Sequence, residues 1–289
     1  MTLAPTDELI ALPTGIRLHV RHWFGEKRPF VLLHGLASNA RLWDQVARVL
    51  NANGHAVVAV DQRGHGLSDK PSSGYDFASV SADLVALLDV LQLTQPILVG
   101  QSWGGNVVLD FGARYPGRAG GLAFIDGGFL DLQRRAGGDW TTTAERLRPP
   151  HLIGTPIAQI RARIRNANPD WADEGVEAVL ANFALQADGT VRPQLTLENH
   201  MQILRALWEQ RPPELYPLVQ EAVVICVALE NDPERRAAKQ AQVAAAVEGL
   251  AQVTVHWFED THHDIHVHRP TELATLLHKA ILDGFWPLS

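Results

Sequence analysis

Six short, continuously apolar runs constrain the fold of this chain more than any other feature. They are FVLL at 30–33, VVAV at 57–60, ILVG at 97–100, LAFI at 122–125, VVICVAL at 223–229 and VTVHWF at 253–258. Runs of this kind are typical of strands in a parallel sheet that is covered on both faces. The sequence therefore predicts a buried and mostly parallel sheet.

Helical patterns separate these runs. Apolar residues recur at three- and four-residue spacing over 42–50, 77–91 and 273–281, which predicts amphipathic helices. Before the first run, residues 16–23 alternate apolar and polar after a Pro-Thr-Gly turn signal, and with 9–12 they predict an antiparallel hairpin. Strands that alternate with helices predict an α/β fold with a doubly wound, mostly parallel sheet.

The alternation breaks between residues 129 and 216. This stretch is read as several helices, including Pro156–Arg165 and Trp171–Leu185, with no convincing strand. The strand pattern then resumes. We therefore expect a core formed by 1–128 and 217–289, and a helical cap at 129–216 that covers a site at the edge of the sheet.

Composition narrows the class of protein. The 289 residues are 46% hydrophobic and carry a net charge of −7, without a block of Lys or Arg that would indicate nucleic-acid binding. The single cysteine, Cys226, lies in an apolar run and is expected to be a buried, inert thiol. The N-terminus lacks the pattern of a signal peptide, and no apolar run approaches the about 18 residues of a membrane span. We expect a cytoplasmic protein without a membrane partner; the oligomeric state stays open.

A serine between glycines points to chemistry. Gly100-Gln101-Ser102-Trp103-Gly104 follows a predicted strand and precedes a predicted helix at 106–115. In this context the G-x-S-x-G pattern places the serine on a strained turn with its hydroxyl exposed. The other interpretation is that Ser102 merely caps the helix.

A nucleophilic serine needs a base, and the base needs an orienting carboxylate. In this architecture the acid and then the histidine follow the serine, on loops after strands. Two strand ends qualify: Glu230-Asn231-Asp232-Pro233 and Thr261-His262-His263-Asp264.

With these motifs the sequence resembles the α/β-hydrolase superfamily. The matching features are His34-Gly35, the stretch from Asp61 to Ser68, the Ser102 turn and the histidine loop. The resemblance covers the predicted core and is weak in the cap. It implies His263 as the base in preference to His262. It implies Asp232 as the acid in preference to Asp126, which ends another strand and matches relatives that take their acid from there.

The resemblance also implies an oxyanion hole formed by the backbone N–H groups of Leu36 and Trp103. Trp103, Leu36, His34 and Phe129 are the expected substrate contacts. The implied activity is a serine hydrolase without a cofactor that cleaves small to medium apolar carboxylic esters. A lactonase or a C–C bond hydrolase could use the same triad, and a ligand-binding receptor-like protein could keep it with slow turnover.

Two other motifs point to binding sites, but neither is complete. The histidines of 262–268 could ligate a metal, yet no H-E-x-x-H or C-x-x-C pattern accompanies them. The stretch 61–68 contains Gly64 and Gly66 but not the full dinucleotide-binding pattern. We therefore expect no metal, and we expect Asp61, Arg63 and His65 to hold their loop in shape.

Overall fold

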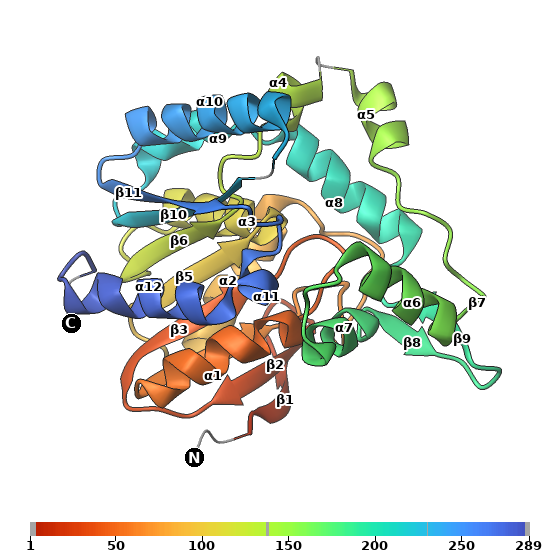
Figure 1. The fold of residues 1–289 in the computed structure, drawn as a ribbon. Helices are drawn as coiled ribbons and strands as arrows, with labels where there is room; N and C mark the ends of the chain where they lie inside the picture. Colours follow the sequence, from red (N-terminus) through yellow and green to blue (C-terminus); the bar gives the residue numbers. More distant parts are fainter. Residues whose placement is uncertain (1–3, 137–138, 230, 287–289) are drawn as a thin grey trace.

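An eight-stranded sheet forms the centre of the molecule (Figure 1). The structure, a computed structural model, describes residues 4–136, 139–229 and 231–286. The strand order is β1-β2-β4-β3-β5-β6-β10-β11, with antiparallel pairing only for β1·β2 and β2·β4. The strands are β1 (Thr6–Ala11), β2 (Arg17–Trp23), β3 (Lys27–Leu33), β4 (His55–Val60), β5 (Ile97–Gln101), β6 (Gly121–Ile125), β10 (Val223–Leu229) and β11 (Val253–Glu259). The predicted hairpin and the mostly parallel α/β sheet are confirmed.

Helices cover both faces of this sheet because its strands are apolar on both sides. In β3, Phe30 and Leu32 pack into the cluster shared with α1 and α12, whereas Val31 and Leu33 pack into the cluster shared with α2, α3 and α10. Cys226 is fully buried in the first of these clusters, as expected. The helices are α1 (Asp44–Ala52), α2 (Phe77–Val90), α3 (Trp103–Arg114), α10 (Pro233–Gly249), α11 (Ile265–His268) and α12 (Pro270–Leu282), preceded by a 3-10 turn η1 (Ala40–Trp43).

The insertion between β6 and β10 is not purely helical. It contains a small antiparallel sheet in the order β7-β9-β8, which corrects the expectation that it has no strand. The predicted helix 171–185 ends at Leu180, and Phe183–Leu185 begins a hairpin that turns at Gly189, where φ is +81°. Its elements are α4 (Leu132–Ala136), α5 (Trp140–Arg146), β7 (Thr155–Pro156), α6 (Ile157–Ala167), α7 (Asp173–Leu180), β8 (Phe183–Leu185), β9 (Thr190–Pro193), α8 (Leu197–Glu209), α9 (Pro212–Leu215) and a 3-10 turn η2 (Tyr216–Leu218).

Buried amide side chains attach this insertion to the core. Asn39 Nδ2 donates to the Ala178 carbonyl at 2.8 Å and to Asn182 Oδ1 at 2.5 Å. On the other side, Asn199 Nδ2 donates to the Tyr75 hydroxyl at 2.6 Å. The insertion therefore lies over the carboxyl ends of the parallel strands (Figure 1). Within the described residues no helix is long and apolar enough to cross a bilayer.

Trp286 tests how far the core depends on the segment after α12. Its side chain is fully buried, and Nε1 donates to the Ala222 carbonyl at 3.0 Å. Trp286→Ala should lower the free energy of unfolding by about 3–5 kcal/mol, because it leaves a large cavity and removes one of the two hydrogen bonds to the Ala222 carbonyl. Urea unfolding measures this. Trp257→Ala is the matched control: that side chain is 40% exposed, so its loss should be much smaller. Equal losses of stability in the two variants would contradict the conclusion that the core depends on Trp286.

Candidate active site

Ser102 occupies a strained turn between β5 and α3. Its φ of 53° and ψ of −121° lie outside the helical and strand regions. The turn closes only with glycine at Gly100, where an added Cβ would lie 2.1 Å from the Gly104 carbonyl oxygen. The Ser102 side chain makes no hydrogen bond that caps α3. Ser102 therefore stands at the N-cap position of α3 without capping the helix through its hydroxyl.

The backbone amides of Leu36 and Trp103 lie near Ser102. Neither Leu36 N nor Trp103 N donates a hydrogen bond to another described residue. The Leu36 loop lies against the serine, since a Cβ added at Gly35 would lie 3.1 Å from Ser102 Cβ. The Trp103 N–H begins α3, where the helix dipole favours negative charge. The two expected oxyanion-hole donors are thus adjacent to Ser102.

His263 is held by Asp126. Its Nδ1 lies 2.6 Å from Asp126 Oδ2, in the arrangement that leaves Nε2 available to a substrate or nucleophile. Asp126 follows Ile125, the last residue of β6, whose carbonyl accepts the Ser102 N–H at 2.9 Å. The Gln101 side chain donates to the His263 carbonyl at 3.4 Å. The three residues therefore converge at one edge of the sheet, although no hydrogen bond joins Ser102 to His263 in the described part of the chain.

The expectation that Asp232 orients the histidine is wrong. Asp232 is the N-cap of α10, and its Oδ1 accepts from the amides of Glu234 at 3.0 Å and Arg235 at 3.1 Å. The rival residue, Asp126, holds the position instead. Asp126 is 2% exposed, whereas the Asp232 side chain is 47% exposed. Of the two candidate acids, Asp126 is the one whose carboxylate contacts the His263 imidazole.

Electrostatics at this pair favour an ionised acid. Burial acts to raise the pKa of the Asp126 carboxyl, but the hydrogen bond and charge of His263, together with Lys239, lower it below its ordinary value. Burial acts to lower the pKa of the His263 imidazole, but the hydrogen bond and charge of Asp126 outweigh it, and this pKa lies above its ordinary value. The histidine is thus a base that Asp126 strengthens.

The loop after β4 is held in shape by its own polar side chains, as expected for Asp61 and His65, and it contacts the segment next to Ser102. Asp61 accepts hydrogen bonds from Ala40 N at 2.7 Å and Leu67 N at 2.9 Å. His65 Nε2 accepts from Ala37 N at 3.2 Å, and its ring stacks on Trp103 at 5.3 Å. This loop therefore fixes the segment that carries the Leu36 amide.

Three of the four predicted substrate contacts are packed inside the protein. Trp103 is 1% exposed, Phe129 1% and His34 0%, and the His34 imidazole accepts from Gln62 N at 3.1 Å. Only Leu36 is partly exposed. His34, Phe129 and the Trp103 ring therefore shape the site from behind its surface, because their rings fill the space between neighbouring elements.

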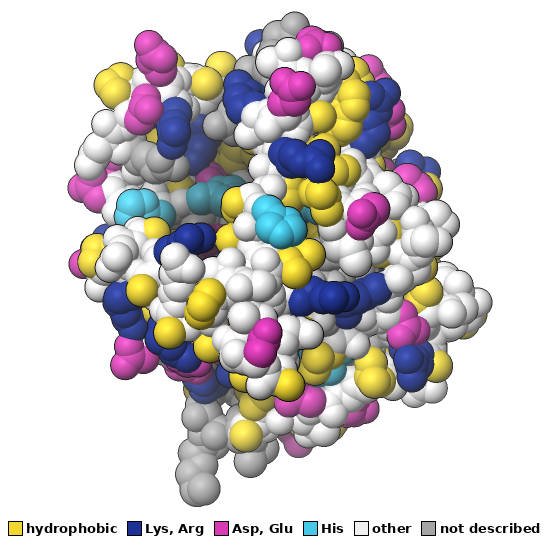
Figure 2. Space-filling view, turned by 90° about the vertical axis from the view of Figure 1, so that its right-hand side faces the viewer, with side chains coloured by type: hydrophobic (Ala, Val, Ile, Leu, Met, Phe, Trp, Pro, Cys, Tyr) yellow, Lys and Arg dark blue, Asp and Glu magenta, His cyan; other side chains and the backbone are white. Residues whose placement is uncertain are grey.

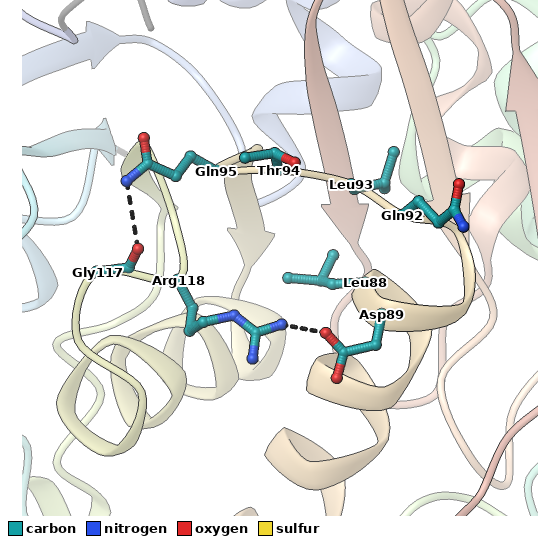
Figure 3. Close-up of a pocket in the computed structure, with 8 residues that line it drawn as sticks. All are labelled: Leu88, Asp89, Gln92, Leu93, Thr94, Gln95, Gly117 and Arg118. Carbon is teal, nitrogen blue, oxygen red and sulfur yellow. Dashed lines mark hydrogen bonds and ion pairs between the residues drawn. The ribbon is translucent and has the colours of Figure 1, made fainter.

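One pocket of the molecule lies away from the residues described above. The pocket drawn in Figure 3, of about 370 Å³, lies before β5 and β6, near their amino ends. Its arginine, Arg118, is paired with Asp89. Ligands of open α/β sheets bind at the opposite, carboxyl ends of the strands. On the face that carries the insertion, histidine side chains border a hollow in the surface (Figure 2).

The histidine-rich segment does not assemble a metal site in the described residues, which contain no group of three or more His, Cys, Asp or Glu side chains placed to hold an ion. His262 and His268 face each other with ring centroids 5.4 Å apart. His266 is fully buried and packs on Trp43 at 4.5 Å. Each of these histidines thus has a different environment from His263.

A mostly parallel sheet with a serine on a strained strand-to-helix turn defines the class of α/β hydrolases. The model of the "Alpha/beta hydrolase family" matches residues 30–276. The chain therefore belongs to this family.

Curated relatives align over a limited stretch. A "Putative non-heme chloroperoxidase" of Synechocystis sp. is 41% identical over 91 residues, 32% of this chain and 33% of that protein. A "2-(acetamidomethylene)succinate hydrolase" of Mesorhizobium japonicum is 35% identical over 111 residues, 38% of this chain and 39% of that protein. The alignments thus span about a third of each relative's length.

Solved structures match over nearly the whole chain. An E-2-(acetamidomethylene)succinate hydrolase superposes with a TM-score of 0.80 at 23% identity, covering 95% of this chain and 98% of that one. An esterase of M. tuberculosis superposes with a TM-score of 0.75 at 20% identity, covering 97% and 93%. At these identities the likeness is one of fold.

The two candidate acids can be separated by matched substitutions. Asp126→Asn should lower kcat by about ten-thousandfold, because the amide cannot stabilise the imidazolium and favours the wrong tautomer. Asp232→Asn should leave kcat unchanged, since asparagine caps a helix as well as aspartate does. Steady-state kinetics on an ester measure both. The reverse ranking would return the acid to Asp232.

Proposed function

We propose that this protein is a serine hydrolase of the carboxylesterase type, acting on small to medium apolar carboxylic esters through an acyl-enzyme on Ser102. The observation that carries the proposal is the 2.6 Å contact between His263 Nδ1 and Asp126 Oδ2 beside a serine in a strained turn. A buried carboxylate that fixes the orientation of a half-exposed imidazole is typical of a site in which Nε2 of that imidazole accepts a proton.

The chemistry follows from this arrangement. His263 Nε2 takes the proton of the Ser102 hydroxyl as its oxygen attacks the ester carbonyl carbon. The resulting oxyanion accepts hydrogen bonds from the amides of Leu36 and Trp103, each worth about 3 kcal/mol in comparable enzymes. The imidazolium, stabilised by Asp126, returns the proton to the departing alcohol. Water, deprotonated by His263, then attacks the acyl group and releases the acid and Ser102.

Named relatives suggest which neighbouring chemistries to test beside ester hydrolysis. One relative and the first matched structure carry the name of a hydrolase of 2-(acetamidomethylene)succinate, and others are named non-heme chloroperoxidase. A lactonase or a C–C bond hydrolase would use the same three side chains, and peroxide could replace water as a side reaction on the acyl-enzyme. We propose a simple ester first because its hydrolysis requires only the Ser102, His263 and Asp126 side chains and two backbone amides.

Hydrolysis of p-nitrophenyl esters from acetate to decanoate tests the proposal. The wild-type protein should turn over at least one chain length, and Ser102→Ala should abolish that turnover, because no other described group replaces the nucleophile. Circular dichroism should show an unchanged fold for the variant. If the folded wild-type protein hydrolyses none of the esters, a C–C hydrolase with a narrow substrate or a ligand-binding protein becomes the better hypothesis.

The pH profile should follow His263. The base must be neutral to accept the serine proton, and Asp126 raises the pKa of its imidazole. Activity should therefore be full above the pKa of His263 and fall as pH decreases through it, at a pH higher than an unperturbed histidine would give. The acid limb of kcat/KM measures this. A limb at or below the ordinary histidine range would contradict the strengthening of the base by Asp126.

A further inference from the structure

A lysine shares the carboxylate oxygen that orients the histidine. Lys239 Nζ lies 2.9 Å from Asp126 Oδ2, the same oxygen that His263 Nδ1 contacts at 2.6 Å. The other oxygen, Oδ1, accepts the Ala228 N–H at 3.0 Å. The carboxylate of Asp126 therefore has three donors, and one of them is the ammonium group of a lysine.

Lys239 is placed by the core. Its Nζ also donates to the Ala228 carbonyl at 2.6 Å, so the ammonium group bridges the end of β10 and the end of β6. The Lys239 side chain is 18% exposed and that of Asp126 is 2% exposed. Ion pairs buried to this degree are poorly screened by salt and strongly affect the titration of their neighbours.

We propose that Lys239 is a positioning residue of the site: its ammonium group fixes the Asp126 carboxylate and limits how strongly that carboxylate favours protonated His263. The proposal rests on the role given above to His263. Asp126 without a second cation would stabilise the imidazolium more, which would help to form it but would leave less of the neutral base at moderately acidic pH. Lys239 therefore sets the balance between stabilising the imidazolium and keeping His263 neutral.

The other charged and titratable groups around His263 do not duplicate this effect. Asp264, on the same loop, favours the imidazolium, as Asp126 does from β6. His266, on α11, is kept neutral because burial lowers its pKa to about 4. Lys239, on α10, is the group that acts on His263 in the opposite direction to the two carboxylates. Its removal should therefore raise the pKa of His263.

A purely structural role for Lys239 makes a different prediction. If the lysine only anchored α10 to the Ala228 carbonyl, its loss would lower the stability or kcat without moving the titration of the histidine. The titration is thus the deciding measurement. Lys239→Met removes the charge but keeps most of the side-chain length, and Lys239→Arg keeps the charge. Lys279→Met, which removes an exposed lysine of α12, is the control for net charge.

The experiment follows the His263 imidazole by NMR through a pH titration in the Ser102→Ala protein, with His263→Gln assigning the signal. Lys239→Met should raise the pKa of His263 by about one unit, which is the low end of the range for the effect of a single nearby charge. Lys239→Arg and Lys279→Met should leave it nearly unchanged. An unchanged pKa in folded Lys239→Met would overturn the proposal. Should that variant not fold, Lys239→Gln, which can still donate to the carbonyl, replaces it with the same expectations.

Kinetics provide a second readout that separates this proposal from the proposed function. With Ser102 present, the acid limb of kcat/KM should move to higher pH in Lys239→Met by the amount that NMR measures. If no ester is hydrolysed by any form of the protein, the proposed function fails, but the NMR titration still decides the role of Lys239. If esters are hydrolysed and the limb does not move, Lys239 has no influence on the base.

Discussion

The site depends on the backbone hydrogen bonds that hold the carboxyl ends of β5 and β6 next to each other. The Ser102 N–H donates to the Ile125 carbonyl at 2.9 Å, which ties the turn after β5 to the last residue of β6. The next residue, Asp126, has a φ of 45° and donates its own N–H to the Cys226 carbonyl at 2.7 Å. One set of backbone hydrogen bonds between parallel strands therefore places Ser102 and Asp126 side by side.

This constraint explains why the carboxylate that contacts His263 comes directly after β6. A non-glycine residue at positive φ is unfavourable unless its surroundings hold it there, and the carboxylate of Asp126 has three partners that do so. The strain at Asp126 and at Ser102 thus lies in adjacent turns at one edge of the sheet. Gly127 follows, where a Cβ would lie 2.2 Å from the Ser102 carbonyl oxygen, so the two turns can approach only with glycine there.

The sheet could be predicted from the sequence, and the Ser102 turn and His263 could be named as candidate site residues, because each is marked by a local pattern. Apolar runs mark the strands, and the glycines around Ser102 mark the turn. The sequence was insufficient for the acid, since Asp232 before Pro233 has the local pattern of a loop acid but equally that of an N-cap followed by proline at the first helical position. Only the tertiary register decides between them. The cap strands were missed because β7, β8 and β9 are two to four residues long, too short to show alternation.

The insertion and the base are also connected by packing. Trp171 and Ala178 of the insertion form one buried cluster with Leu42 of η1 and Val267 of α11, the helix that follows His263. At Gly175 an added Cβ would lie 2.9 Å from the Val267 side chain, so α7 rests closely on α11. The insertion is thus packed directly on the helix that follows His263.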